Sequence, residues 1–174
     1  MGKRPATPSK RGQCIEQSST ININQRSVTE EIPLVGLNQS LVYSSERIQG
    51  NGNLDKFKFG FGGWALAKQM FFDFRNNKLY SGSGALIKVN GIPTADGYAV
   101  PDETGNKIFF FDQFGTHLRT RDALLGTTLE TWNYDSSKRL IAITNQFQQS
   151  IRFEYYNNNS MDILSGINST FWQW

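Results

Sequence analysis

Hydrophobic and polar residues alternate in short stretches along this chain, with the two-residue period of β-strands in a half-buried sheet. In IRFEY (151–155) the three apolar side chains share one face, and the arginine and the glutamate share the other. Asn-Gly, Asp-Gly and Asn-Asn pairs separate such stretches at the spacing typical of turns in an antiparallel sheet. No stretch combines a helical period with capping residues. The pattern therefore predicts an all-β fold of antiparallel hairpins with few or no helices.

Two stretches are ambiguous on pattern alone. GGWALAKQMFFDF (62–74) has the length of a short helix, but the leading glycine pair and the strand-like neighbours favour strand. LIAI (140–143) is apolar at every position, so we expect this strand either to be covered on both faces or to lie beneath the N-terminal region.

One motif recurs three times in residues 111–166. The copies begin FDQFGTHL (111–118), YDSSKRLIAIT (134–144) and YNNNSMDIL (156–164). The opening aromatic stands at positions 111, 134 and 156, and a later aliphatic residue recurs with nearly the same period at Leu118, Leu140 and Ile163. A fixed period marks stacked repeats, in which each unit buries its apolar side against its neighbours. Each copy therefore predicts a strand, a turn and a returning strand.

The turn of each repeat has a physical basis in its residue types. Asp112 and Asp135 directly follow the opening aromatic, and we expect each carboxylate to accept a backbone N–H two residues further on. Gly115 is predicted to take the positive φ that closes the bend. The aromatic residue in front of the aspartate is expected to anchor the turn to the sheet.

The chain has 174 residues and a net charge of +3, which suits one domain with a core and does not indicate nucleic-acid binding. Basic residues and prolines at the start, with no aromatic beside them, predict a disordered basic leader over 1–14. After the leader we expect a β-region over 15–110, the three repeats over 111–166 and an aromatic tail over 167–174. No apolar run approaches a membrane span, and the start lacks the apolar core of a signal peptide.

Residues suited to catalysis or to cofactor binding are few. Cys14 is the only cysteine, and no phosphate loop occurs, so we expect no disulfide, no metal and no cofactor. His117 is the only histidine and has no serine or cysteine at a triad-like spacing, so we interpret it as a surface residue of the repeat. The adjacent acidic pairs at 30–31 and 102–103 point to opposite faces of a strand. We therefore expect no catalytic residues and no enzyme activity.

The repeats resemble the RHS/YD-repeat family, which includes the shells of bacterial RHS polymorphic toxins, the Tc toxin cocoon and the teneurin shell. The family's repeat has an aromatic-Asp pair, two spacers, Gly-Arg-Leu and a strand ending in Thr; here Lys138 stands where Gly is usual. The matching repeat positions are Phe111, Asp112, Gly115 and Leu118 in the first copy, Tyr134, Asp135, Arg139, Leu140 and Thr144 in the second, and Tyr156 and Asn157 in the third.

Two blocks ahead of the repeats are also similar to this family. EEIPLVGLNQSLVYSSERIQG (30–50) resembles the segment that leads into the shell, and GGWALAKQMFFDFRNNKLYSGSGALI (62–87) resembles its GGW strand and the hairpin that follows. The similarity therefore covers residues 30–165. Because family members carry many more repeats, the chain looks like a short N-terminal-type fragment.

The resemblance implies a structural, toxin-associated role: a curved wall or partial β-shell made of antiparallel YD-repeat hairpins. A wall this short leaves strand edges unpaired and an apolar side uncovered. It would either pair with a protein partner, namely the remainder of the shell or its toxin cargo, or collapse on itself as a small sandwich. The resemblance also implies a bacterial protein that is cytoplasmic before export by a specialised secretion system, with extracellular delivery.

The alternative is a stand-alone β module that binds carbohydrate or protein through exposed aromatic residues. Sugars stack on indole rings, but we expect Trp64 and Trp132 to lie in the sheet core. The C-terminal FWQW (171–174) is apolar at a chain end, so Phe171, Trp172 and Trp174 are predicted to contact a partner.

Overall fold

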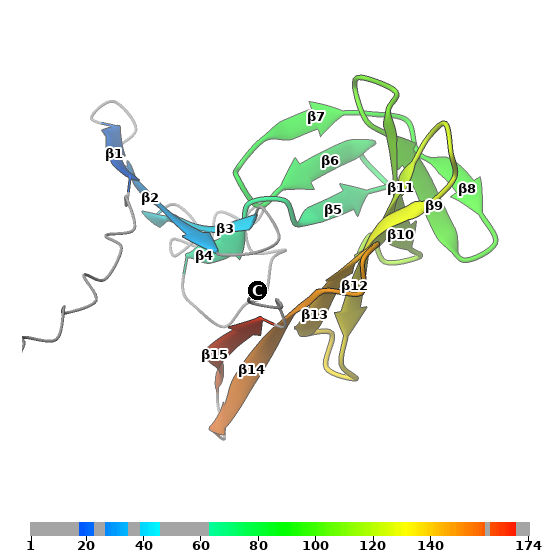
Figure 1. Cartoon of the computed structure of the whole chain (residues 1–174). Coiled ribbons are helices and arrows are strands. Elements are labelled where there is room, and N and C mark those ends of the chain that lie inside the picture. The colour runs from blue at the N-terminus through cyan, green and yellow to red at the C-terminus, as the bar shows by residue number, and fades with distance from the viewer. Residues whose placement is uncertain (1–17, 23–26, 35–38, 46–62, 159–160, 170–174) are drawn as a thin grey trace, which may run out of the picture.

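The computed structural model describes residues 18–22, 27–34, 39–45, 63–158 and 161–169. For 18–22, 27, 156–158, 161–166 and 169 it describes the backbone alone. Within these ranges the chain forms fifteen β-strands, and all of their pairings are antiparallel (Figure 1). This confirms the all-β fold of antiparallel hairpins that the alternation and the turn signals predicted.

The strands form three sheets. The four-stranded sheet has the order β1-β2-β3-β4, and the three-stranded sheet has the order β5-β6-β7. The eight-stranded sheet runs β15-β14-β13-β12-β11-β10-β9-β8 and holds the repeats. The bounds are β1 Ser18–Asn22, β2 Ser27–Leu34, β3 Gln39–Ser44, β4 Trp64–Leu66, β5 Met70–Asp73, β6 Lys78–Ser81, β7 Leu86–Lys88, β8 Ile92–Thr94, β9 Gly97–Pro101, β10 Lys107–Asp112, β11 His117–Asp122, β12 Thr128–Tyr134, β13 Leu140–Asn145, β14 Ser150–Asn158 and β15 Met161–Ser169.

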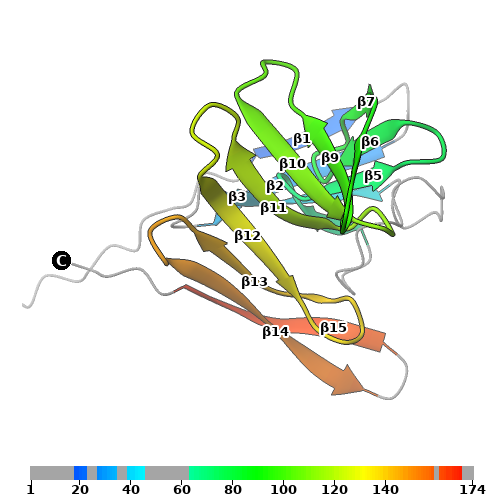
Figure 2. The same cartoon turned by 90° about the vertical axis from the view of Figure 1, so that its right-hand side faces the viewer.

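The eight-stranded sheet is a simple meander, in which each strand pairs with the next strand along the chain. Its strands β9 to β15 form a long twisted strip (Figure 2). Successive turns alternate between its two rims. The 112/135 rim carries the turns 112–116 and 135–139, and the 122/145 rim carries the turns 102–106, 122–127 and 145–149.

The core lies between one face of this strip and the two smaller sheets. Leu66 of β4 is fully buried against Trp132, Leu140, Ile143, Ile151 and Phe153 of the strip. A second cluster joins Phe72 and Leu79 of the three-stranded sheet to Val100 and Phe111. The apolar face is therefore covered by the other two sheets, as in the sandwich alternative. The strip nevertheless keeps two edge strands, β8 and β15, that pair with no further strand of the described part.

The two ambiguous stretches resolve differently. Residues 62–74 contain two strands, β4 and β5, and no helix among the described positions, as the pattern favoured. The expectation that 140–143 is covered on both faces is wrong, because Ile141 is 38% exposed whereas Leu140 and Ile143 are buried. The strip has only one covered face, and Ile141 is the extra residue of the β-bulge opposite 133/134, so its side chain meets solvent while Leu140 and Ile143 on either side of it face the core.

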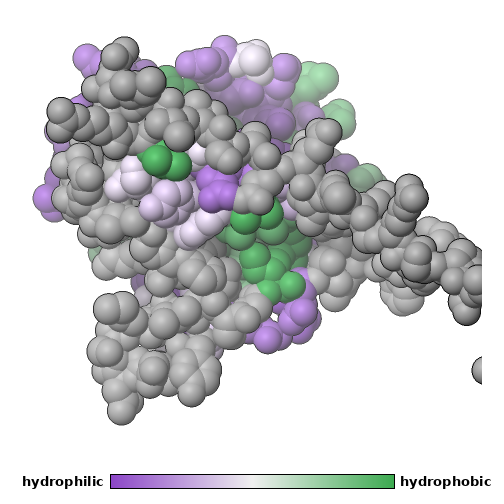
Figure 3. Space-filling view, turned by 90° about the vertical axis from the view of Figure 1, so that its left-hand side faces the viewer, coloured by the Kyte–Doolittle hydropathy of each residue, from purple (hydrophilic) through white to green (hydrophobic). Residues whose placement is uncertain are grey.

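The alternation predicted for IRFEY is confirmed. Ile151 and Phe153 are buried, whereas Arg152 and Glu154 are exposed. On the side of the molecule that faces left in Figure 1, hydrophobic surface gathers at the centre with hydrophilic residues beside it (Figure 3).

Leu66 connects the four-stranded sheet to the strip, and its substitution tests that connection. Leu66→Ala should lower the free energy of unfolding by about 2–5 kcal/mol, because it opens a cavity in a fully buried cluster. Ile141→Ala is the matched control on the exposed face and should change it by no more than about 0.5 kcal/mol. Urea unfolding measures both; similar losses would show that the two sheets are not packed as described.

Candidate functional site

The turn at Asp112 closes the hairpin of β10 and β11 on its own side chain. Its Oδ1 atom accepts the backbone N–H of Phe114 at 2.9 Å and that of Thr116 at 2.8 Å. The Asp112 carbonyl accepts the N–H of Gly115 at 3.0 Å, and its N–H donates to the Thr116 carbonyl at 2.9 Å. The bond two residues on is the one expected from the sequence.

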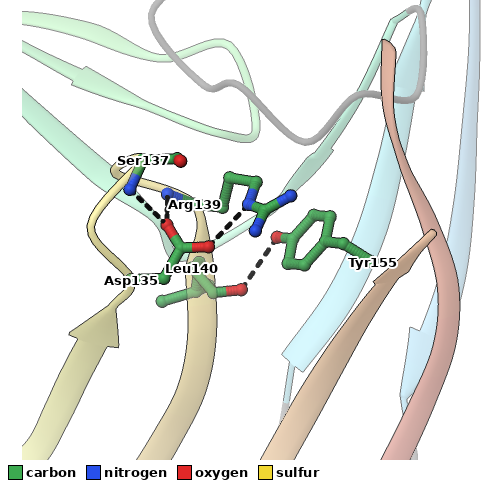
Figure 4. Close-up of polar contacts among 5 residues, drawn as sticks. All are labelled: Asp135, Ser137, Arg139, Leu140 and Tyr155. Carbon is green, nitrogen blue, oxygen red and sulfur yellow. Dashed lines mark hydrogen bonds and ion pairs between the residues drawn. The ribbon is translucent and has the colours of Figure 1, made fainter. Parts of the chain in front are cut away.

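The turn at Asp135 repeats this arrangement between β12 and β13 (Figure 4). Oδ1 accepts the N–H of Ser137 and that of Arg139, both at 2.9 Å, and Oδ2 accepts the Arg139 Nε–H at 2.6 Å. Burial alone would raise the pKa of Asp135, but the hydrogen bonds and charge of Arg139 and the Ser137 N–H together lower it below its usual value. The carboxylate thus stays ionised and holds the turn.

Tyr155 of β14 links this second repeat to the third. Its hydroxyl donates to the Leu140 carbonyl at 2.8 Å, and the Arg139 guanidinium lies over its ring at 5.1 Å (Figure 4). The Arg139 side chain is therefore held between a carboxylate and an aromatic face, an arrangement that its planar charge suits.

The same turn occurs at Asn145 on the opposite rim, where the repeat pattern had not predicted one. Asn145 Oδ1 accepts the N–H of Phe147 at 2.9 Å and that of Gln149 at 3.0 Å. Asp122 caps a turn one residue longer, with Oδ1 accepting the N–H groups of Leu124 and Leu125. The signal was present in the sequence, because the spacing from Asp122 to Asn145 equals the spacing from Asp112 to Asp135.

Each of these five-residue turns needs a positive φ three residues after its first position. Gly115 has φ 88°, and Lys138 and Gln148 hold the same place with φ 64° and 62°. Gly115 is constrained twice, because a Cβ atom there would lie 2.0 Å from the Phe72 carbonyl oxygen of β5. That close approach accompanies a hydrogen bond from the Phe72 N–H to the Gly115 carbonyl at 3.0 Å. Lys138, where the family has glycine, keeps the conformation at a cost in strain.

Neighbouring turns on the 112/135 rim contact each other through Lys138. Its Nζ atom lies 3.5 Å from Asp112 Oδ2 and 5.5 Å from the centre of the Phe114 ring. The Lys138 side chain is 63% exposed, so solvent screens the ion pair and its contribution to stability is small. The contact does show that successive repeats are aligned turn against turn.

In the first two hairpins the opening aromatic pairs with the residue six positions further along the chain. This pairing corrects the repeat position assigned to Leu118. Phe111 pairs with His117, and Tyr134 pairs with Leu140. Leu118 is therefore not the counterpart of Leu140; it lies on the opposite, half-buried face. The sequence alignment was one residue out because it matched leucine to leucine, whereas the two hairpins have the same turn length and the same β-bulge, at 110/111 and 133/134, and so place His117 at the position of Leu140.

His117 therefore occupies the core position of the repeat leucine, and its interpretation as a surface residue is wrong. It is 1% exposed, and its ring lies 4.9 Å from that of Trp132 and 5.4 Å from that of Phe111, measured between centroids. Its Nε2 atom shares a hydrogen bond with Thr120 Oγ1 at 3.1 Å. Burial lowers the pKa of His117 from 6.5 to about 3, so the ring is neutral near pH 7.

The predicted positions of the first two repeats can be followed in the structure, whereas the third repeat is one residue out, because the β-bulge at 154/155 makes Tyr155, paired with Leu164, the counterpart of Phe111 and Tyr134. Phe111 and Leu140 are buried, and Thr144 on β13 shares a hydrogen bond with Ser150 at 3.0 Å between hydroxyl oxygens. Tyr134 packs on the core with its hydroxyl enclosed, and this burial raises its pKa. Tyr156 and Asn157 lie in β14, where only their backbone is described, paired with Ile163 and Asp162. Phe171, Trp172 and Trp174 lie outside the described residues, as does the predicted leader.

The tail boundary predicted at 167 falls inside a strand, because β15 continues to Ser169. Within the described ranges no helix has the length and apolarity to cross a bilayer. In that same part of the chain no three histidine, cysteine, aspartate or glutamate residues are grouped as metal ligands would be.

The two edges of the strip differ in length and composition. β8 has three residues, all exposed, with Pro93 at its centre. β15 has nine residues and contains no proline. Short strands and proline disfavour the addition of another strand, whereas the longer β15 edge has room for one on either side of its β-bulge at 164–166. β15 is therefore the edge suited to pairing.

Gly115 and Lys138 hold the same turn position, but substitutions there are expected to change the free energy of unfolding in opposite directions. Gly115→Ala should lower the free energy of unfolding by about 2–4 kcal/mol, because it adds strain at positive φ and a clash with Phe72. Lys138→Gly should leave it unchanged or raise it by up to about 1 kcal/mol, since strain is released and only an exposed contact is lost. Thermal and urea unfolding measure both changes. If Lys138→Gly destabilised the protein, Lys138 would not be strained at its positive φ.

The buried histidine predicts a pH dependence of stability. The pKa of His117 is depressed in the folded chain, so its contribution is fully present above the unfolded value of 6.5 and is lost as the pH falls towards 3. The wild type should therefore lose up to about 1.4 kcal/mol per pH unit between about pH 6.5 and 5.

The double variant His117→Leu/Thr120→Ile copies the Leu140 and Ile143 pair of the next repeat and should lose this dependence. Burial raises the pKa of Glu130, despite the opposing charges of Lys68 and Lys107, and this adds a slope of opposite sign that both proteins share. Urea unfolding at a series of pH values makes the comparison. An equal slope in the two proteins would show that His117 is not titrating from a buried site.

Comparison with known proteins gives one family. Residues 95–171 match the family model described as Teneurin YD-shell, a range that begins just before β9 and includes β15. No curated protein matches the chain. The similarity noted for residues 30–94 lies outside this match and stays a prediction. The match covers the strip from β9 to β15 with its repeated hairpins, and it supports a YD-shell, RHS-type family and a shell-like structural role for this part of the chain.

Proposed function

We propose that the chain is a wall segment of a β-shell and is completed by a partner chain whose own YD-repeat hairpins pair with β15. The family match supports a structural role of this kind. The finer statement, that a separate polypeptide carries the remaining repeats or is the enclosed cargo, is our inference from the edges of the strip.

The observation that carries the proposal is the asymmetry of those edges. The strip presents nine residues of β15 at one edge and three residues around Pro93 at the other. Among the described strands none lies beyond β15, so the outward backbone N–H and C=O groups of this edge need either water or another strand. A further hairpin of the same repeat would continue the meander in the same direction.

The partner should be another repeat hairpin because of the rim contacts. Lys138 of one turn reaches Asp112 and Phe114 of the turn one repeat earlier. Arg139 and Leu140 likewise contact Tyr155 of the following repeat. These contacts join one repeat to the next, and a hairpin of the same type added at β15 would extend the series.

The proposal includes a toxin-associated role in a bacterial system, cytoplasmic before export by a specialised secretion system, and it includes no enzyme activity. The resemblance of the repeats and of the two leading blocks to RHS-type shells supports the first part. The second is supported by His117, whose imidazole is enclosed by Phe109, Phe111 and Trp132 and hydrogen-bonded to Thr120. A histidine in that position has no contact with a dissolved substrate.

The carbohydrate-binding alternative depends on tryptophan rings in solvent. Trp132 is 2% exposed, and Trp64 is half-buried with its ring 5.3 Å from that of Tyr43. Neither presents an open indole face, so the described tryptophans do not favour this function.

Co-expression tests the proposed pairing. The probe is a second chain made of two further copies of residues 122–144, which is one full repeat beginning at the turn residue Asp122. We expect it to co-purify with the full chain and to be displaced when β15 is altered. Asn168→Lys adds charge at this edge, where Asn168 is exposed and already donates to Glu154, and should reduce the recovered partner at least about fivefold.

Thr94→Lys is the matched control, because it places the same charge on the exposed β8 edge. It should leave recovery of the partner unchanged. Absence of co-purification, or an equal loss in the two variants, would refute pairing at β15.

A further inference from the structure

The 122/145 rim exposes hydrophobic side chains at the tip of a turn. Leu124 is 91% exposed and Leu125 is 72% exposed, and they are neighbours in the turn 122–127. Single exposed apolar residues are common, but two adjacent leucines at a projecting tip form a hydrophobic knob. No described residue of the chain covers them.

The knob is held by a rigid backbone. Asp122 Oδ1 accepts the N–H of Leu124 at 2.9 Å and that of Leu125 at 2.8 Å. The Ala123 N–H donates to the Asn106 carbonyl of the neighbouring turn at 2.9 Å, and Gly126 closes the turn at φ 68°. The leucines are therefore presented in a fixed conformation, which lowers the entropy lost when they bind.

A cavity of about 230 Å³ lies beside the next turn of the same rim. An engineered cavity of about 150 Å³ holds benzene, so this one has room for a leucine side chain. Asp102, Glu103 and Thr104, which belong to the turn 102–106, are among its lining residues. Its walls are the apolar side chains of Met70, Leu79, Ile87, Val89 and Phe109.

Knob and cavity are thus neighbours on one rim, because the turns that carry them are joined by the bond between Ala123 and Asn106. A surface with a projecting group beside a matching recess is complementary to itself under a two-fold rotation, since each copy supplies one of each. The charges beside knob and cavity are mixed: Asp102 and Glu103 line the cavity, and Asp122 at the base of the knob pairs across from the exposed Lys107, which is the basic residue available to the acidic pair of a second copy.

We propose that the 122/145 rim is an interaction surface for a second copy of this chain, forming a two-fold dimer in which the leucine knob of each copy enters the cavity of the other. The contact is small, so the dimer is weak and reversible. It uses turns at the ends of the strands and not the β15 edge, and therefore does not depend on the proposed function.

Sedimentation equilibrium of the full chain tests this. The wild type should pass from monomer to dimer with a dissociation constant on the order of micromolar to millimolar. Leu124→Glu/Leu125→Glu should weaken the dimer at least about tenfold, because it places charge against the apolar walls. Ile87→Phe, which fills the cavity and leaves the knob intact, should weaken it as well.

Two comparisons make the result specific. Phe114→Glu alters an exposed hydrophobic residue of the other rim, 62% exposed, and should leave the dimer unchanged, as should Asn168→Lys at β15. Mixing the knob variant with the cavity variant should restore one of the two contacts and give a heterodimer more stable than either variant alone.

A chain that stays monomeric at all concentrations overturns the proposal. So does a dimer that survives loss of the knob, one that depends on Asn168, or a mixture that gives no heterodimer. Circular dichroism of each variant establishes that it is folded.

Discussion

A side-chain oxygen at the first position of a turn, bonded to two backbone N–H groups, is the interaction on which this structure depends. It occurs at Asp112, Asp135 and Asn145 with nearly identical geometry. By satisfying the inward-pointing N–H groups it fixes the length of the turn, and the length of the turn fixes which residues face each other across the hairpin. A slip of one residue would turn every core side chain to solvent.

As a consequence, the repeats keep the same backbone pairing and turn conformation, whereas the side chains at equivalent positions differ in polarity. Leu140 and Ile143 fill the core of the second hairpin, and His117 and Thr120 fill the equivalent positions of the first. The polar pair is accommodated because Nε2 and Oγ1 satisfy each other and the ring stacks among aromatic neighbours. The fourth position of the turn shows the same tolerance, since glycine, lysine and glutamine all adopt the positive φ that the turn requires.

Local features were predictable from the sequence and register was not. The strands, the antiparallel hairpins and the Asp112 and Asp135 bonds follow from alternation and turn chemistry, which involve neighbours along the chain. The burial of His117 depends on a β-bulge at 110/111, and the residue types at these positions do not indicate a bulge. The exposure of Ile141 depends on the matching β-bulge at 133/134, which has Ile141 as its extra residue, and on sheets from elsewhere in the chain, which cover one face of the strip only. The turn at Asn145 could have been predicted, because the distance along the chain from Asp122 to Asn145 equals the length of the repeat.

The β15 edge of the strip can pair with a further strand, whereas the β8 edge cannot. Amide hydrogen exchange on the full chain, alone and with added repeat hairpins, tests this most directly. Alone, the outward-facing amides of β15 should exchange much faster than those of β11 to β13, and added hairpins should protect them while leaving β8 unchanged. Protection of β15 in the isolated chain equal to that of β12, or protection that appears at β8 instead, would contradict the account.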